Sequence, residues 1–285
     1  MQFPSKIYID GGDPKETKAA DELLKKAGYH GLDGQTTNPS LIAKNLASRR
    51  QGVKVIAQEA FDEYKKIVQE MSAIIPDGKI SIQVIGDPVT MTKEAMLTQA
   101  RDRKTWIQNA IIKLPCTTAG VAAAAEFCTE GAINITLNFS LEQAAAVYSA
   151  TKLHTHDVFI SPFVGRFDDR GEKGMDFISN ELALLSNGDG HVQVITASVR
   201  NMDHLLYALK LKSHIVTIPF TVFTKWAESG FTLPGDEYIY NPQGLTEMPY
   251  HEVTLDNEWE TYDISHPLTD AGTVKFWEDW KSIVQ

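Results

Sequence analysis

Short apolar runs alternate with longer mixed segments along most of the chain. The short runs are rich in β-branched residues and end at polar or turn-forming positions, which is typical of buried strands. We expect about eight strands, at Lys6–Asp10, within Gly31–Leu41, and at Lys79–Ile85, Asn109–Leu114, Ala132–Phe139, Val158–Ile160, Val192–Thr196 and His214–Ile218. We expect helices after them, at Pro14–Lys26, Ser40–Ser72 with a break near Gly52, Val89–Lys104, Thr118–Thr129, Leu141–Thr151, Lys173–Leu185, Met202–Leu211 and Pro219–Glu228.

This alternation predicts an α/β fold with a parallel sheet, because parallel strands need a crossover between them. Eight units in about 230 residues fit a single (β/α)8 barrel better than an open sheet with extra helices. We therefore expect a barrel domain at residues 1–230 and a C-terminal extension at residues 231–285. Within the extension, Thr273–Val284 is amphipathic and carries two tryptophans. It fits a helix that docks either on its own barrel or on a neighbouring subunit.

The composition describes a globular protein. Of the 285 residues, 43% are hydrophobic and 22% are charged. The net charge of -10 argues against a nucleic-acid partner, although it leaves room for a local basic pocket. Cys116 and Cys128 fit reduced core thiols. The first residues lack a secretion-signal pattern and no apolar run is long enough to span a membrane, so we expect a cytoplasmic protein without a membrane partner.

Lys113 lies inside the apolar run that ends at Pro115. A strand buried on both faces takes this lysine away from water, which disfavours the ammonium and lowers its pKa. A neutral lysine amine is a nucleophile suited to Schiff-base chemistry. The alternative is a lysine at a strand end that points into water.

The other strands also end in polar side chains. In a parallel barrel the carboxyl ends of all strands lie at one face, and enzymes with this fold have their active sites there. Convergence of several groups favours a site over a set of solvated strand ends. The candidate site residues at or after the strand ends are these polar groups together with Lys113 and the aromatic Phe163. The full set is Asp10, Asn38, Gln83, Lys113, Asn134, Thr136, Ser161, Phe163, Arg166, Ser198 and Arg200.

Six segments in this order resemble the transaldolase family, which includes the fructose-6-phosphate aldolases. The segments are Ile9–Asp10, Asp33–Leu41, Ile111–Pro115, Asn134–Ser140, Ser161–Arg166 and Ala197–Asn201. The resemblance runs from about Ile7 to Lys225 and leaves out the tail after Gly230. It implies a TIM barrel that performs class I aldol chemistry on sugar phosphates, without a metal or other cofactor. We also expect a homo-oligomer.

The resemblance also implies roles for the polar strand ends. Lys113 matches the Schiff-base lysine and Asp10 the catalytic aspartate, which either moves a proton or balances the iminium charge. Thr136 matches the threonine that holds a catalytic water. Three residues match groups that hold substrate hydroxyls, and three match or lie near the phosphate site. They are Asn38, Asn134 and Ser161 for the hydroxyls, and Arg166, Ser198 and Arg200 for the phosphate.

For either arginine the alternative is a surface ion pair. This alternative fits Arg166, whose neighbours Asp168 and Asp169 are ready partners, better than Arg200.

Two positions bear on the type of reaction. Gln83 matches the glutamine of the aldolases, where transaldolases usually have glutamate, and glutamine cannot titrate. Phe163 matches the phenylalanine of transaldolases, where the aldolases have a tyrosine that helps to release the enamine. Without this phenol we expect transfer to an acceptor aldehyde, hence a transaldolase. The alternatives are an aldolase that releases free dihydroxyacetone, and a sugar-phosphate binder without catalysis.

Overall fold

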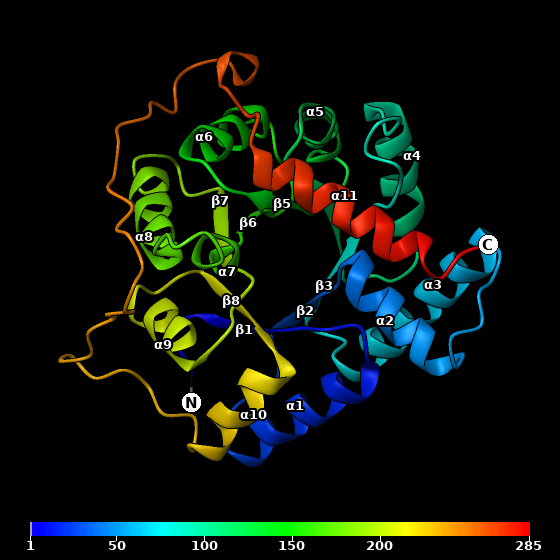
Figure 1. The fold of residues 1–285 in the computed structure, drawn as a ribbon, viewed down its shortest axis with the longest axis horizontal. Coiled ribbons are helices and arrows are strands. Elements are labelled where there is room, and N and C mark those ends of the chain that lie inside the picture. The colour runs from blue at the N-terminus through cyan, green and yellow to red at the C-terminus, as the bar shows by residue number, and fades with distance from the viewer. Residues whose placement is uncertain (1) are drawn as a thin grey trace.

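The computed structural model describes residues 2–285, and within them eight parallel strands close into a barrel in sequence order (Figure 1). The strands are β1 (Lys6–Asp10), β2 (Gly34–Thr36), β3 (Lys79–Gln83), β4 (Ala110–Pro115), β5 (Ile133–Asn138), β6 (Val158–Pro162), β7 (Val192–Thr196) and β8 (Ile215–Pro219). Pairing of β1 with β8 completes the ring. The predicted (β/α)8 barrel is thus confirmed, and the open-sheet alternative is wrong.

Helices surround the barrel (Figure 1). They are α1 (Pro14–Lys26), α2 (Pro39–Arg49), α3 (Ala57–Ile74), α4 (Lys93–Lys104), α5 (Thr118–Phe127), α6 (Leu141–Ala150), α7 (Val164–Asp168), α8 (Gly174–Leu185), α9 (Met202–Lys210), α10 (Phe220–Glu228) and α11 (Pro267–Lys281), with a 3-10 turn, η1 (Trp259–Thr261). None of the helices within residues 2–285 combines the length and hydropathy needed to cross a membrane. Cys116 and Cys128 are buried free thiols, as predicted.

A small cluster of apolar side chains from separate strands fills part of the barrel interior. Tyr8, Ile111 and Phe159 pack in this cluster and are almost completely buried. Side chains two positions apart on a strand share a face. Asp10 and Lys113 therefore face the same side as Tyr8 and Ile111, one layer nearer the carboxyl ends of the strands.

Three local features differ from the sequence-based expectation. Helix α4 begins at Lys93 instead of Val89, because a turn around Asp87 precedes it and the Thr92 hydroxyl caps it. Helix α7, directly after β6, was not expected. Strand β5 carries a bulge, where Leu137 has a φ of 62° and the register with β6 shifts.

Helix α11 begins at Pro267, before the expected Thr273, and crosses the mouth of its own barrel (Figure 1). The Thr269 hydroxyl donates a 2.8 Å hydrogen bond to the Leu137 carbonyl at the β5 bulge. A Cβ on Gly272 would lie 2.6 Å from a methyl carbon of Leu137, so a side chain at this position would require Leu137 to shift. At the other end of the helix, Asp279 accepts a hydrogen bond from the Ser40 hydroxyl at the start of α2.

Candidate active site

Lys113 is 2% exposed, and its Nζ donates a 3.3 Å hydrogen bond to the Thr37 carbonyl. Burial lowers the pKa of its ammonium to about 8, and the nearby Asp10 opposes that shift. The Nζ also lies 5.8 Å from the centre of the Phe163 ring. The lysine therefore faces the barrel interior and not bulk water. At neutral pH an appreciable part of it carries the free amine.

Asp10 ends β1 and belongs to a chain of hydroxyl contacts. Its Oδ1 accepts a 2.8 Å hydrogen bond from the Thr36 hydroxyl, which lies 2.6 Å from the Thr217 hydroxyl. Burial raises the pKa of Asp10 above its usual range, while Lys113 and the bond from Thr36 oppose this rise. A carboxyl held in this way can exchange a proton nearer to neutral pH than a solvated one.

A cavity of about 280 Å³ opens at the carboxyl ends of the strands. Seven of the eleven predicted site residues line it: Asp10, Asn38, Lys113, Phe163, Arg166, Ser198 and Arg200. The Asn38 side-chain oxygen is engaged as the cap of α2, accepting from Leu41 N at 3.0 Å, so its amide nitrogen is the group left for a ligand. Within residues 2–285, no cluster of three or more His, Cys, Asp or Glu side chains is arranged to hold a metal ion.

The four remaining predicted residues do not line this cavity and are almost completely buried. The Asn134 amide bridges two hydroxyls, accepting from Ser161 at 2.7 Å and donating to Ser81 at 3.2 Å. Gln83 Oε1 and Thr136 Oγ1 are buried polar atoms without a hydrogen-bond partner in the described chain. Buried orphans of this kind are satisfied by an ordered water or by a ligand.

Gln83 lines a second cavity of about 310 Å³. Phe276 of α11 lines both this cavity and the one that holds Lys113. Helix α11 therefore forms part of the wall of both cavities.

The expected contrast between the two arginines is reversed. Arg200 forms the surface ion pair, with its guanidinium 2.8 Å from Asp169, the residue directly after α7. Arg166 makes no ion pair with any carboxylate in residues 2–285. Its expected partners Asp169 and Asp168 pair instead with Arg200 and His204. Both arginines nevertheless line the same cavity.

Arg200 packs closely on the backbone at Gly165. A Cβ on Gly165 would lie 2.4 Å from Nε of Arg200, and Ser198 adopts a left-handed φ of 59°. Strain of this type persists only where the surroundings enforce it.

Two parts of the site are absent from the sequence-based set. Tyr64 of α3 is fully buried, and its hydroxyl contacts the Thr37 hydroxyl at 2.6 Å and the Gln83 backbone NH at 3.0 Å. Its one sequence signal is a polar tip within the apolar stripe of a helix. Helix α11 contributes Lys275, Phe276 and Asp279 to the cavity wall, and Lys275 forms an ion pair with Asp279.

Comparison with known proteins identifies the relatives of this chain. The profile of the Transaldolase/Fructose-6-phosphate aldolase family matches residues 7–285, so the expectation that the tail lies outside the resemblance was wrong. A probable transaldolase of Prosthecochloris aestuarii is 34% identical over 277 residues, covering 96% of each chain. A probable transaldolase of Dehalococcoides mccartyi is 30% identical over 282 residues, covering 98% of this chain and 99% of that protein. The chain therefore belongs to the transaldolase/fructose-6-phosphate aldolase family.

Proposed function

We propose that the protein is a transaldolase, which moves a dihydroxyacetone unit from a ketose phosphate to an aldose phosphate through a Schiff base on Lys113. The observation that carries the proposal is the buried Lys113 amine, with its lowered pKa, in a cavity lined by Asp10 and two arginines. Membership of the family supports an enzyme of this type.

In the proposed reaction the neutral Nζ of Lys113 attacks the ketone carbon of the donor, and loss of water leaves a protonated imine. The bond between the third and fourth carbons then breaks, and its electron pair moves toward the iminium to form an enamine. Asp10 accepts the proton of the fourth-carbon hydroxyl, which becomes the carbonyl of the departing aldose. The enamine adds to an acceptor aldehyde, Asp10 returns the proton, and hydrolysis of the new imine releases the product ketose.

The remaining residues hold the substrates in this scheme. A water bound by Gln83 Oε1 and Thr136 Oγ1 would satisfy both orphaned atoms and supply the hydrolysis step. Asn38, Asn134 and Ser161 would bind hydroxyls of the dihydroxyacetone unit. Arg166, Arg200 and Ser198 would bind the phosphate, for which a guanidinium fork is complementary.

A fructose-6-phosphate aldolase is the second candidate, favoured by the uncharged Gln83. The two differ in the fate of the enamine: hydrolysis releases dihydroxyacetone, whereas transfer needs an acceptor. We would incubate the protein with fructose 6-phosphate alone and then with erythrose 4-phosphate. A transaldolase alone releases at most one equivalent of glyceraldehyde 3-phosphate and keeps the enamine, so we expect multiple turnovers only with erythrose 4-phosphate. Release of free dihydroxyacetone over many turnovers without erythrose 4-phosphate would overturn the transferase assignment.

Borohydride reduction in the presence of fructose 6-phosphate tests for the covalent intermediate and against a non-catalytic sugar-phosphate binder. We expect a stable adduct on Lys113 by peptide mass spectrometry, and none in Lys113→Ala. If the parent gave no adduct, or the variant gave as much, the Schiff-base mechanism would be wrong.

A further inference from the structure

A cavity of about 520 Å³ is lined by residues of α3, α4 and the C-terminal end of α11, and it is separate from the cavity that holds Lys113. Figure 1 shows these three helices on one side of the barrel. Its lining is strongly aromatic and includes Phe61, Trp106, Trp277 and Trp280. Cavities of this size and lining are typical of small-molecule sites. No residue proposed for the transaldolase reaction lines it.

Arg103 of α4 lines this cavity and is 2% exposed. Its Nε is buried without a hydrogen-bond partner, and no carboxylate in residues 2–285 forms an ion pair with its guanidinium. The guanidinium lies 5.3 Å from the centre of the Phe61 ring and 5.2 Å from that of Trp106. Burial lowers the pKa of Arg103 to about 10, so it is still a cation at neutral pH.

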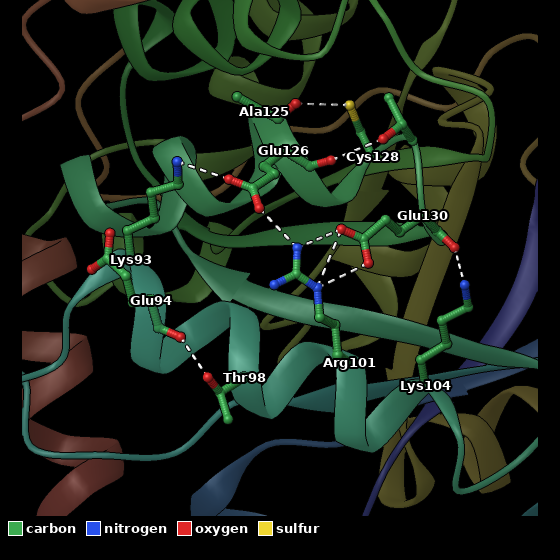
Figure 2. Close-up of polar contacts among 10 residues, drawn as sticks. Lys93, Glu94, Thr98, Arg101, Lys104, Ala125, Glu126, Cys128 and Glu130 are labelled. Carbon is green, nitrogen blue, oxygen red and sulfur yellow. Dashed lines mark hydrogen bonds and ion pairs between the residues drawn. The ribbon is translucent and has the colours of Figure 1, made fainter.

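Arg101, two residues earlier on α4, is a second arginine whose charge is paired with carboxylates. Arg101 points outward and is 2.8 Å from Glu126 and 2.6 Å from Glu130 on the neighbouring segment (Figure 2). The Arg101 side chain is also 49% exposed to solvent. Arg103 is 2% exposed and makes no ion pair with a carboxylate of residues 2–285, whereas buried charges are ordinarily paired. The ring contacts offset only part of this cost.

The carboxylates beside the cavity do not pair directly with this guanidinium. The charge of Asp102 raises the pKa of Arg103, but its side chain forms no ion pair with Arg103 and accepts a 3.0 Å hydrogen bond from the Trp106 indole. Asp62 accepts a hydrogen bond of 2.9 Å from Gln58, and Lys65 adds a positive charge to the lining. The cavity therefore combines a buried guanidinium that lacks a direct carboxylate partner with several flat apolar walls.

We propose that this cavity is a second ligand site, which binds a small molecule made of a planar ring and one anionic group, carboxylate or phosphate. The anionic group pairs with Arg103, and the ring packs against the indoles of Trp106, Trp277 and Trp280. Such a ligand supplies both the counter-charge and the stacking surface that the cavity offers.

Phenyl phosphate is a suitable probe, because three of the five tryptophans line the cavity and report binding by fluorescence. The titration is made in an Arg166→Ala/Arg200→Ala background, so that the active-site arginines do not contribute. We expect saturable quenching in this background. In the same background Arg103→Met, which keeps length and removes charge, should weaken binding about 10-fold or more. Arg101→Met is the matched control and should leave binding unchanged.

Circular dichroism establishes that each variant is folded. If Arg103→Met does not fold, Trp277→Ala serves instead, with weaker binding of phenyl phosphate expected. Three outcomes would overturn the proposal: no saturation in the Arg166→Ala/Arg200→Ala background, unchanged affinity in the folded Arg103 variant, or an Arg101→Met effect as large as that of Arg103→Met. Each outcome leaves the borohydride test of Lys113 unaffected, so failure of this site is distinguishable from failure of the proposed enzyme.

Discussion

The Nζ of Lys113 is held by the backbone carbonyl of Thr37, at 3.3 Å. A carbonyl orients an amine but carries no full charge to stabilise an ammonium. Asp10 lines the same cavity without forming an ion pair with the lysine. The effect of burial therefore outweighs the opposing charge of Asp10, and the pKa of Lys113 falls to about 8.

Imine formation should therefore depend on pH. The rate of borohydride-trapped adduct formation with fructose 6-phosphate should rise as pH increases to about 8 and level off above it, since only the free amine attacks. The adduct is trapped with borohydride at fixed times at several pH values between 6 and 10, and its amount gives the rate of imine formation. A rate that still rises steeply at pH 10, as for a solvated lysine, would contradict the burial argument.

Stability provides an independent measurement of the same shift. Between about pH 8 and pH 10.5 the unfolded lysine binds a proton that the folded one does not, so the free energy of unfolding should rise with pH in that window. Below pH 8 both states are protonated and the destabilisation is fully present. Lys113→Met lacks the titrating group, so the difference between parent and variant should shrink as pH rises. Urea unfolding at several pH values tests this.

Phe163→Tyr should direct the enamine toward water. The ring centre lies 5.8 Å from the Lys113 Nζ and the side chain is 9% exposed, so an added phenol would be beside the imine. A positioned phenol can orient or activate a water there. We expect release of dihydroxyacetone from fructose 6-phosphate alone to increase about 10-fold or more. Phe163→Leu removes the ring without adding a hydroxyl, and equal release from both variants would exclude a role for the phenol.

The ion pair of Arg200 with Asp169 competes with a substrate anion. Asp169→Asn should lower KM for fructose 6-phosphate about two- to five-fold, because an exposed pair contributes about 1 kcal/mol or less. Arg166→Gln should raise KM about 10-fold or more, since Arg166 makes no competing ion pair in the described chain. Both effects should disappear with unphosphorylated fructose. Arg170, which pairs with Glu172 outside this cavity, is the control, and an equal effect of Arg170→Gln would point to bulk charge.

The fold and the buried lysine followed from local pattern, whereas the contacts of several site residues did not. Strand and helix periodicity predicts the barrel, and an ionisable residue in an apolar run singles out Lys113. The partner of that lysine is a backbone carbonyl, which has no sequence signature. The Arg200–Asp169 pair depends on the unexpected helix α7, and the contact of α11 with the barrel depends on the bulge at Leu137. These features arise from tertiary geometry and not from residue type.

Helix α11 places a positive charge at the cavity that the arginines share. Lys275 lines the cavity, pairs with Asp279 and is 57% exposed, and Asp279 is tied to Ser40 of α2. A substrate phosphate at the two arginines would offer Lys275 a second anionic partner. Lys275→Gln should therefore raise KM for fructose 6-phosphate about two- to five-fold with little change in kcat, in keeping with a half-exposed contact.

The matched control for this charge is Lys281→Gln, on the same helix but outside the cavity and paired with Glu278. Its KM should equal that of the parent. Unphosphorylated fructose should show no difference between Lys275→Gln and the parent, because the charge acts on the phosphate. A rise in KM for both sugars would mean that the substitution displaces α11 as a whole. A change in kcat alone would assign Lys275 to a step other than substrate binding.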